Sequence, residues 1–311
     1  MDFCRKLFLA PLAGITDRAF RKVCRQFGAD VVCTEMISAK GIWYQDKKTE
    51  SLMMFGTDEM PCGIQLFGSE PEIMAHAVQV AAAHNPAYID LNMGCPVPKI
   101  VKNGDGSALM KSLSLASKII EAAVKSVSLP VTVKFRLGFD RDISVEFAQM
   151  ACVSGAAALF VHGRTREQFY SGTADWDAIR RVKEVSTVPV IGNGDVFSPE
   201  AAEQILKQTG CDSIMVARGA LGNPFLFAQI RSYFATGQYV VPTERQRLDT
   251  ALEQLEGMCM DKGERIAVPE AKKHIAWYLK GMRGNAEFKN RIFAASGLEQ
   301  MRQILIELRD R

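Results

Sequence analysis

The chain has 311 residues, 48% of them hydrophobic, and its 38 basic and 35 acidic residues leave a formal net charge of +3. This is the composition of an ordinary folded protein, and it excludes a disordered chain and a strongly basic nucleic-acid-binding tail. The length exceeds the roughly 250 residues of a (β/α)8 barrel, so a barrel would leave room for a modest second unit.

No apolar run reaches the roughly 18 residues of a membrane span, and the first residues lack the apolar core and cleavage site of a signal peptide. We therefore expect a cytoplasmic protein with no membrane partner. The eight cysteines form no C-x-x-C pair, which argues against zinc ribbons, iron–sulfur clusters and thioredoxin-type chemistry. We expect no metal, and most cysteines to serve packing.

Short apolar runs alternate with helical patterns over most of the chain. The expected strands are residues 7–10, 31–34, 63–66, 88–91, 131–135, 159–161, 188–191 and 214–217. The expected helices include residues 17–27, 71–83, 113–126, 145–154, 176–185 and 199–209. Residues 41–58 are expected to form a longer, less regular loop. Eight β–α repeats predict a parallel sheet closed into a (β/α)8 TIM barrel. A doubly wound sheet is the alternative, weakened because no G-x-G-x-x-G follows the first strand.

The pattern changes after residue 227, and only helical periodicity remains from residue 243. Apolar residues recur at spacings of three and four in two stripes, residues 248, 252, 255 and 259 and residues 298, 301, 305 and 308. These stripes predict a small all-α helical bundle. The predicted organisation is a catalytic barrel domain at residues 1–238 and a helical domain at residues 243–311.

Polar residues gather where the expected strands end, which is where barrel enzymes carry their chemistry. They are Gln65, Asn92, Cys95, Lys134, Arg136, His162, Arg164, Asn193, Asp195 and Arg218. A purely structural barrel has no need of such a rim, so we interpret the chain as an enzyme.

The fifth expected strand alternates apolar residues with Thr132, Lys134 and Arg136. If the apolar residues face the surrounding helices, Lys134 and Arg136 point inward at the barrel mouth. An inward lysine is costly to desolvate without an anionic partner. That partner is either an internal carboxylate such as Asp90 or an anionic cofactor.

Two glycine-containing segments follow the seventh and eighth expected strands, at residues 192–195 and 217–220. Barrels frequently bind phosphate with these two loops. Glycines let backbone N–H groups approach an oxyanion, and Arg218 offers a bidentate guanidinium. The pair of loops predicts a phosphate site.

Cys95 lies between Gly94 and Pro96 in the loop after the fourth expected strand. An unperturbed thiol is only about 3% ionised at pH 7. No nearby His/Asp arrangement would activate it, because the histidines at 76, 84 and 274 fall on helical patterns. We interpret Cys95 as a proton donor.

Several segments resemble the flavin-dependent tRNA-dihydrouridine synthases, most closely their bacterial B-type branch. These segments are residues 10–17, Gln65 within residues 64–68, residues 90–96, residues 131–138 with Lys134, residues 161–165, residues 193–195 and residues 217–220. The resemblance covers the barrel and continues into the helical tail. Leu12 and Ala217 depart from methionine and glycine in relatives, and the second weakens a backbone phosphate contact at Ala217.

The resemblance implies FMN at the barrel mouth, reduced by NADPH or NADH. The flavin contacts that it implies are Pro11, Leu12, Ala13, Gln65 and Lys134, with His162, Asn193, Gly194, Asp195, Ala217 and Arg218 around the ribityl phosphate. It implies that hydride passes from flavin N5 to uracil C6 and that Cys95 protonates C5. Asn92, Arg136 and Arg164 are candidates for holding uracil or RNA.

The tail carries six cations but only Glu287 as an acid between residues 271 and 291. A solvated helix face is one interpretation, and a footprint for the tRNA backbone is the other. Beside a base-modifying barrel we favour tRNA, with contacts at Lys272, Lys273, Lys280 and Arg283, and we expect a monomer. A small-molecule pyrimidine dehydrogenase of the dihydroorotate or dihydropyrimidine type and a non-catalytic RNA-binding regulator are the alternatives.

Overall fold

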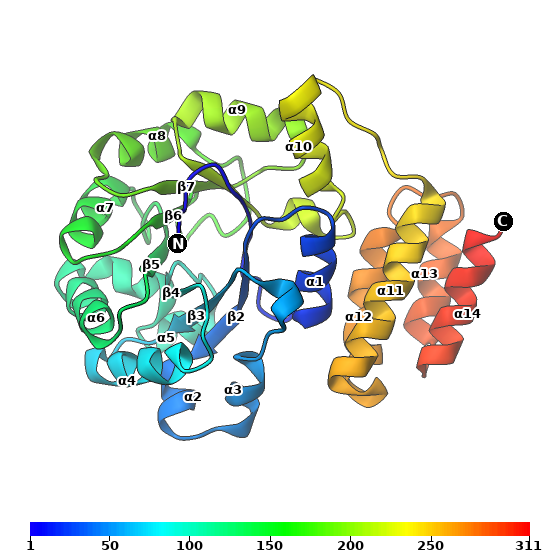
Figure 1. Ribbon diagram of the computed structural model, residues 1–311, viewed down its shortest axis with the longest axis horizontal. Helices are drawn as coiled ribbons and strands as arrows, with labels where there is room; N and C mark the ends of the chain where they lie inside the picture. Colours follow the sequence, from blue (N-terminus) through cyan, green and yellow to red (C-terminus); the bar gives the residue numbers. More distant parts are fainter.

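A computed structural model describes residues 1–311, the side chain of Lys48 excepted. Eight parallel strands form one sheet in the order β1-β8-β7-β6-β5-β4-β3-β2. A parallel bridge between Phe8 and Val31 links the two ends of this order and closes the barrel. Figure 1 shows the barrel surrounded by helices, with a bundle of four further helices to one side. The predicted (β/α)8 barrel followed by a helical bundle is confirmed.

All eight expected strands are present, although several end later than predicted. They are β1 (Leu7–Leu9), β2 (Val32–Ser38), β3 (Cys62–Phe67), β4 (Tyr88–Met93), β5 (Val131–Arg136), β6 (Leu159–His162), β7 (Val190–Asn193) and β8 (Ser213–Val216). Strand β2 runs four residues past its predicted end because its pairing with β3 resumes, after a register shift, between Met36 and Gln65.

Seven longer helices cover the outside of the barrel. They are α1 (Arg18–Gln26), α4 (Pro71–Ala82), α6 (Leu113–Ser126), α7 (Ser144–Val153), α8 (Trp176–Val185), α9 (Pro199–Thr209) and α10 (Leu226–Thr236). Side-chain caps mark several starts, as where Asp17 accepts a hydrogen bond from the Phe20 N–H.

The segment expected to be an irregular loop contains short helices instead. They are α2 (Ala39–Trp43), α3 (Lys47–Leu52) and the 3₁₀ turn η1 (Thr57–Glu59). The prediction for residues 41–58 is wrong because helices this short carry too few turns for a periodic pattern to show. Three further short elements follow strand ends: α5 (Pro98–Lys102), η2 (Gly106–Lys111) and η3 (Arg218–Ala220).

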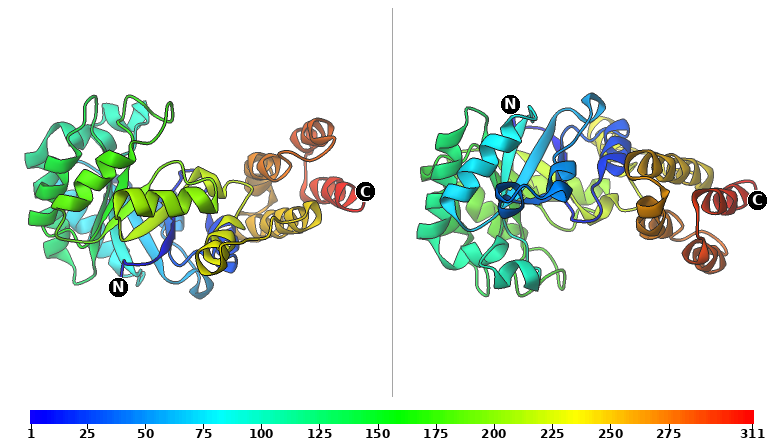
Figure 2. Two further views of the ribbon diagram at one scale, coloured as in Figure 1. Left: turned by 90° about the horizontal axis from the view of Figure 1, so that it is seen from above. Right: turned by 90° about the horizontal axis from the view of Figure 1, so that it is seen from below.

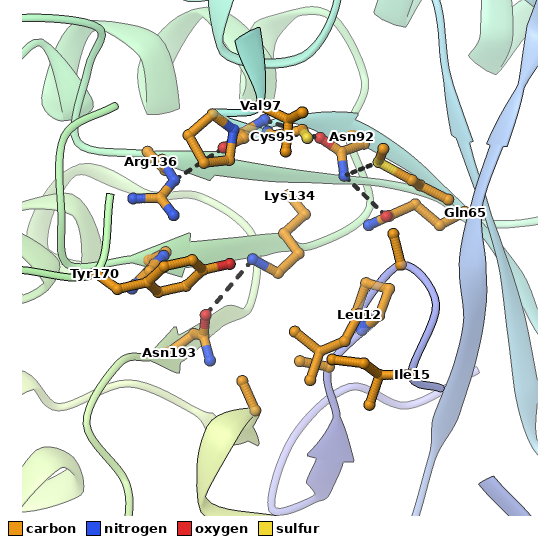
Figure 3. A pocket seen from close by; sticks show the side chains of 18 residues that line it. Leu12, Ile15, Gln65, Asn92, Cys95, Val97, Lys134, Arg136, Tyr170 and Asn193 are labelled. Atoms are coloured by element: carbon orange, nitrogen blue, oxygen red, sulfur yellow. Dashed lines mark hydrogen bonds between the residues drawn. The ribbon is translucent and has the colours of Figure 1, made fainter. Parts of the chain in front are cut away.

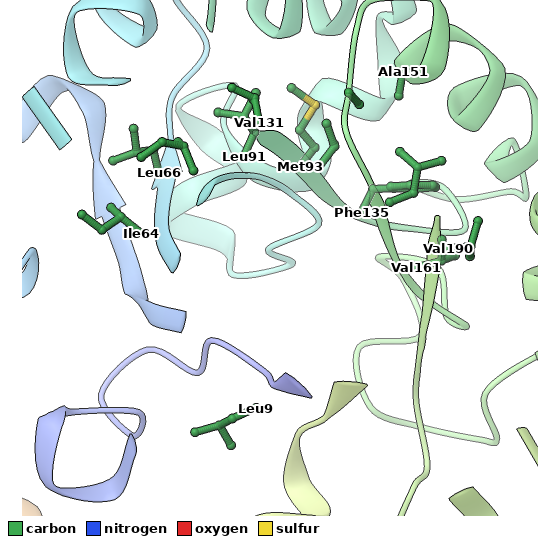
Figure 4. Packing of buried hydrophobic residues seen from close by; sticks show 14 of the residues in the cluster. Leu9, Ile64, Leu66, Leu91, Met93, Val131, Phe135, Ala151, Val161 and Val190 are labelled. Atoms are coloured by element: carbon green, nitrogen blue, oxygen red, sulfur yellow. The ribbon is translucent and has the colours of Figure 1, made fainter. Parts of the chain in front are cut away.

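Two apolar layers stabilise the barrel. One lies between strands and helices, and Figure 4 shows Leu66, Leu91 and Val161 within it. The other fills the barrel interior with aromatic rings, and the Phe8 and Phe160 centroids are 5.1 Å apart. These rings lie toward the amino ends of the strands. The interior therefore has room for a polar pocket only at the carboxyl ends.

The helical bundle consists of α11 (Glu244–Lys262), α12 (Glu264–Tyr278), α13 (Asn285–Ala294) and α14 (Leu298–Arg309). Residues 238–243 connect it to α10 without regular structure. The two predicted apolar stripes lie in its core. No helix in the described part of the chain combines the length and apolar character needed to cross a membrane.

The bundle docks on the barrel through α11 and α12, as both views in Figure 2 show. Ala19 and Phe225 of the barrel join the apolar core of the bundle. Lys262 Nζ lies 2.7 Å from Asp17 Oδ2, and Arg18 Nη1 lies 3.3 Å from Asp261 Oδ1. These contacts fix the position of the bundle relative to the barrel.

Candidate active site

A pocket opens at the carboxyl ends of the strands, and all eight strands or the loops after them contribute to it. Its lining is Ala10, Pro11, Leu12, Ala13, Ile15, Met36, Gln65, Asn92, Gly94, Cys95, Pro96, Val97, Lys134, Arg136, His162, Tyr170, Asn193 and Ala217. Figure 3 shows Cys95 and Asn92 on one side, Leu12 and Ile15 on the other, and Lys134 between them. The structure therefore brings most of the predicted site residues together at one mouth, but Arg164, Gly194, Asp195 and Arg218 are not part of this lining.

A buried hydrogen-bond chain holds the floor of the pocket. Thr132 Oγ1 and Gln65 Nε2 donate to the two oxygens of Asp90 at 2.6 and 2.7 Å. Asn92 Nδ2 donates to Gln65 Oε1 at 2.9 Å. The side-chain oxygen Oδ1 of Asn92 accepts from the Cys95 N–H at 2.9 Å. Asn92 therefore links the floor of the pocket to the loop that carries the cysteine.

Cys95 is half-buried and its loop is fixed from outside the pocket. Ser107 donates through its N–H and hydroxyl to the Cys95 carbonyl at 3.1 and 2.9 Å. Gly106 has φ +60°, and a Cβ there would lie 3.0 Å from the Cys95 Cβ, so this approach needs glycine. Burial raises the pKa of the Cys95 thiol, although Arg136 and Lys134 oppose that rise. A thiol with a raised pKa keeps its proton at neutral pH, as the predicted proton donor requires.

Lys134 extends into the pocket, as its alternating register predicted. Its Nζ lies 3.5 Å from Asn193 Oδ1, and no ion pair joins it to any described carboxylate. Burial and the neighbouring Arg136 charge lower the pKa of Lys134, while Asp90 acts in the opposite direction. Because Asp90 bonds to Gln65 and Thr132 instead, the structure does not show the Lys134–Asp90 pair that was one explanation for this lysine.

The loops after β7 and β8 meet in a recess that adjoins the pocket. Its lining includes His162, Tyr170, Asn193, Gly194, Asp195, Ala217, Arg218 and Gly219. No hydrogen-bond partner within the described chain is found for the backbone N–H groups of Gly194, Arg218 and Gly219. Burial and nearby cations hold the pKa of His162 well below its usual value, so this ring is neutral at pH 7. The recess offers free N–H groups and a guanidinium to an anion.

Asp195 lines the recess and pairs there with two arginines. Its carboxylate accepts from Arg164 at 2.7 Å, from the Ala174 N–H at 2.7 Å and from Arg218 at 3.0 Å. Although burial acts against ionisation, the Arg164 and Ala174 bonds lower the pKa of Asp195. Its carboxylate therefore orients Arg218 within the recess, and a contact between Asp195 and the cofactor stays a prediction.

Arg164 was expected to contact uracil or RNA, and its burial contradicts this. The residue is 1% exposed, and its guanidinium donates to the carbonyls of Ser171 and Gly172 besides Asp195. No sequence pattern indicates that residues 163–175 fold back over this side chain. Arg164 instead fixes that loop to the recess.

Arg136 has a related structural role. Its Nε donates to the Gly94 carbonyl at 2.9 Å, and Nη1 donates to the carbonyls of Thr165 and Phe169 at 3.0 and 2.8 Å. It thereby joins the Cys95 loop to the loop after β6. Since Arg136 also lines the pocket, contact with substrate stays a prediction for it.

Tyr170 is a site residue that the sequence analysis does not predict. It lines both the pocket and the recess and is 48% exposed. The Arg218 guanidinium carbon lies 4.9 Å from the centre of its ring. Tyr170 sits in an irregular loop with no periodicity or motif of its own, so only the folded chain shows its position.

The tail cations differ in their surroundings. Lys272 donates to the Phe293 carbonyl, and Arg291 pairs with Glu307, which removes Arg291 from the free cluster. Lys280 and Arg283 are exposed and unpaired among the described residues. A Cβ placed on Gly14 would lie 3.5 Å from Lys273 Nζ, so Lys273 reaches the edge of the pocket.

No three described His, Cys, Asp or Glu side chains gather as metal ligands would.

The fold and this mouth define a (β/α)8-barrel enzyme whose pocket gathers a thiol and a buried lysine next to a recess lined by Arg218 and glycine loops. The chain belongs to the dihydrouridine synthase family, whose model matches residues 8–310.

Two curated relatives and two solved structures illustrate the likeness. A probable tRNA-dihydrouridine synthase of Rickettsia conorii is 41% identical over 94% of this chain and 89% of its own. tRNA-dihydrouridine synthase B of Pseudomonas aeruginosa is 38% identical over 91% and 86%. Histamine dehydrogenase from Rhizobium sp. 4-9 matches 86% of this chain and about half of its own (49%), with TM-score 0.58 and 15% identity. An old yellow enzyme homologue from Zymomonas mobilis matches 78% and 92%, with TM-score 0.50 and 12% identity. The two structures show the fold alone.

Proposed function

We propose that this chain is an FMN-dependent tRNA-dihydrouridine synthase that reduces the C5=C6 bond of uridines in tRNA, with NADPH or NADH as reductant. The observation that carries the proposal is the meeting of Cys95, Lys134 and the anion recess around a single pocket in a member of this family. We further propose that it is a monomer and that it acts in the cytoplasm, where tRNA is found.

The residues present fit FMN. The free N–H groups of Gly194, Arg218 and Gly219, with the Arg218 guanidinium, suit the phosphate. Pro11, Leu12 and Ala13 form an apolar wall beside Gln65 and Lys134, as the isoalloxazine ring requires. His162, Asn193 and Ala217 lie between these two regions and would contact the ribityl chain.

The chain's own residues supply the proton and the electrostatics of the reaction. Reduced flavin, when bound, supplies hydride to uracil C6, and the negative charge that results spreads over C5 and the C4 carbonyl. Cys95 donates its proton to C5, and the thiolate regains a proton from solvent. The Lys134 charge in a desolvated pocket stabilises negative charge beside it. Asn92 and Arg136 hold the Cys95 loop at a fixed position while this occurs.

We propose that residues 1–238 form the catalytic domain and residues 243–311 a tRNA-binding domain. The exposed cations Lys280 and Arg283, with Lys273 beside Gly14 and the half-buried Lys272, support a contact with the RNA backbone. Such contacts neutralise phosphates without reading sequence.

The test is to incubate the purified protein with NADPH and unmodified tRNA and to measure dihydrouridine in the RNA. We expect a yellow protein whose reductase activity depends on tRNA. Turnover of free dihydroorotate or uracil without tRNA would favour the small-molecule dehydrogenase. A colourless protein that binds tRNA and does not gain activity with added FMN would favour the regulator.

A further inference from the structure

The segment that follows Cys95 forms one edge of the pocket. Val97 lines the pocket, and α5 begins at the next residue, Pro98. The charged residues between positions 97 and 111 are Lys99, Lys102, Asp105 and Lys111. Asp105 is 5% exposed, whereas all three lysines are exposed. The solvent-facing charge of this edge is therefore entirely positive.

These lysines have no carboxylate partner in the described chain. Lys99 and Lys102 take part in no ion pair, and Lys111 Nζ lies 3.6 Å from the centre of the Phe139 ring. Lys40, on the neighbouring α2, differs because it pairs with Glu70 at 2.7 Å. Unpaired surface ammonium groups contribute little to folding stability. Lys99 and Lys102 are thus free to meet an external anion.

A further cation, Lys273, lies on the other side of the pocket from α5. Lys273 of the helical bundle lies beside Gly14, in the loop after β1, while α5 follows β4. Strands β2 and β3 separate β1 from β4 in the barrel. Figure 3 shows the two sides directly, with Ile15 and Leu12 of the first loop facing Cys95 and Val97 of the second. Cations from two different domains therefore flank the opening.

We propose that α5 is a second RNA-binding edge, with Lys99 and Lys102 binding backbone phosphates on one side of the target nucleotide and Lys273 binding those on the other. This inference rests on the proposed tRNA substrate. A base can enter the pocket only if its nucleotide leaves the stack, and its flanking phosphates then remain at the rim. Lys99 and Lys102 follow the wall residue Val97 within five residues, and Lys273 lies beside Gly14, between the wall residues Ala13 and Ile15. The RNA strand thus crosses the mouth between barrel and bundle instead of lying on the bundle alone.

The double variant Lys99→Gln/Lys102→Gln tests this edge against a matched control, Lys118→Gln/Lys125→Gln on the outer helix α6. Both doubles remove two exposed charges, so they change the net charge of the chain equally. Binding of unmodified tRNA is measured over a range of salt concentrations. The α5 double is expected to flatten the slope of log affinity against log salt by up to about 0.7–0.9 per lost contact. It should raise KM for tRNA and leave flavin content, reduction by NADPH and kcat at saturating tRNA unchanged.

Equal slopes and affinities for the two doubles would overturn the inference and make α5 a solvated surface. A lower kcat with unchanged affinity would also overturn it, because the lysines would then act in the chemistry. If the wild-type protein forms no dihydrouridine in tRNA, the proposed function itself fails. Normal wild-type activity together with an unaffected α5 double refutes only the second edge.

Discussion

The polar side chains of the barrel mouth and the exposed cations of the helical bundle differ in burial and in their hydrogen-bond partners. At the mouth, Arg136, Arg164 and Asn92 are partly or fully enclosed and each makes several hydrogen bonds within the site. In the bundle, Lys280 and Arg283 project into solvent without a partner among the described residues. Charges act strongly in a water-poor pocket and weakly when solvent and salt screen them. Single changes at the mouth should therefore have large effects, and changes on the bundle small ones that multiply.

The largest effect is expected from Cys95→Ala. The variant loses the proton donor but no charge, so reduction by NADPH should proceed while re-oxidation of the flavin by tRNA slows by about 10²–10⁴-fold. Stopped-flow measurement of the two half-reactions separates these steps. Cys95→Ser should be nearly as slow, because a hydroxyl is a much weaker acid than a thiol. Cys152→Ala, on the outer helix α7, is the control. A Cys95→Ala rate equal to that of the control would make Cys95 a packing residue.

Arg218→Ala should come next, since it removes the guanidinium from the anion recess. A hydrogen bond to a charged group contributes about 1.5–3 kcal/mol, so FMN should bind roughly 10- to 150-fold more weakly. Flavin content after purification and titration with FMN measure this loss. Arg180→Ala, on the exposed face of α8, should retain normal flavin binding. Unchanged occupancy in a natively folded Arg218→Ala protein would remove the phosphate assignment.

The pH dependence of the re-oxidation step should reflect the enclosed thiol. Cys95 must be protonated to act, and burial raises its pKa above the usual value of about 8.5. The rate should therefore stay level through neutral pH and fall as pH rises through the raised pKa, by up to about tenfold per unit. The residual rate of Cys95→Ala should lack this fall. If it persists there, another group with an alkaline pKa, such as Lys134, is responsible.

The smallest single effects are expected on the bundle. Each of Lys280→Gln and Arg283→Gln should weaken tRNA binding by no more than about fivefold, the range of an exposed ionic contact of 0.2–1 kcal/mol. Combining them with Lys272→Gln and Lys273→Gln should multiply the losses and flatten the salt dependence. Filter binding or anisotropy at several salt concentrations is the measurement. One bundle substitution as damaging as Cys95→Ala would break the contrast between the two regions.

Sequence patterns predicted the parts of the site that depend on strand register. Alternation along β5 placed Lys134 inside the barrel, and the position of Cys95 after β4 placed it at the mouth, because both follow from local geometry. The loops after β7 and β8 were paired correctly for the same reason.

The features that the sequence patterns did not predict mostly depend on contacts between segments that are distant in the chain. Arg164 is buried because residues 171–172 return over it, and Tyr170 reaches the pocket through that same loop. The short helices α2 and α3 lack the length for a periodic signal. Lys273 could be assigned to a basic tail, but its position beside Gly14 depends on how α12 docks on the barrel.

The most direct test of the account is an anaerobic single-turnover experiment. The protein is reduced with one equivalent of NADPH, freed of excess reductant and mixed with unmodified tRNA. The account predicts that the flavin spectrum returns to the oxidised form and that one dihydrouridine appears in the RNA per flavin re-oxidised. Flavin that stays reduced with tRNA, or that re-oxidises without any dihydrouridine, would contradict the claim that this barrel reduces uridine in tRNA.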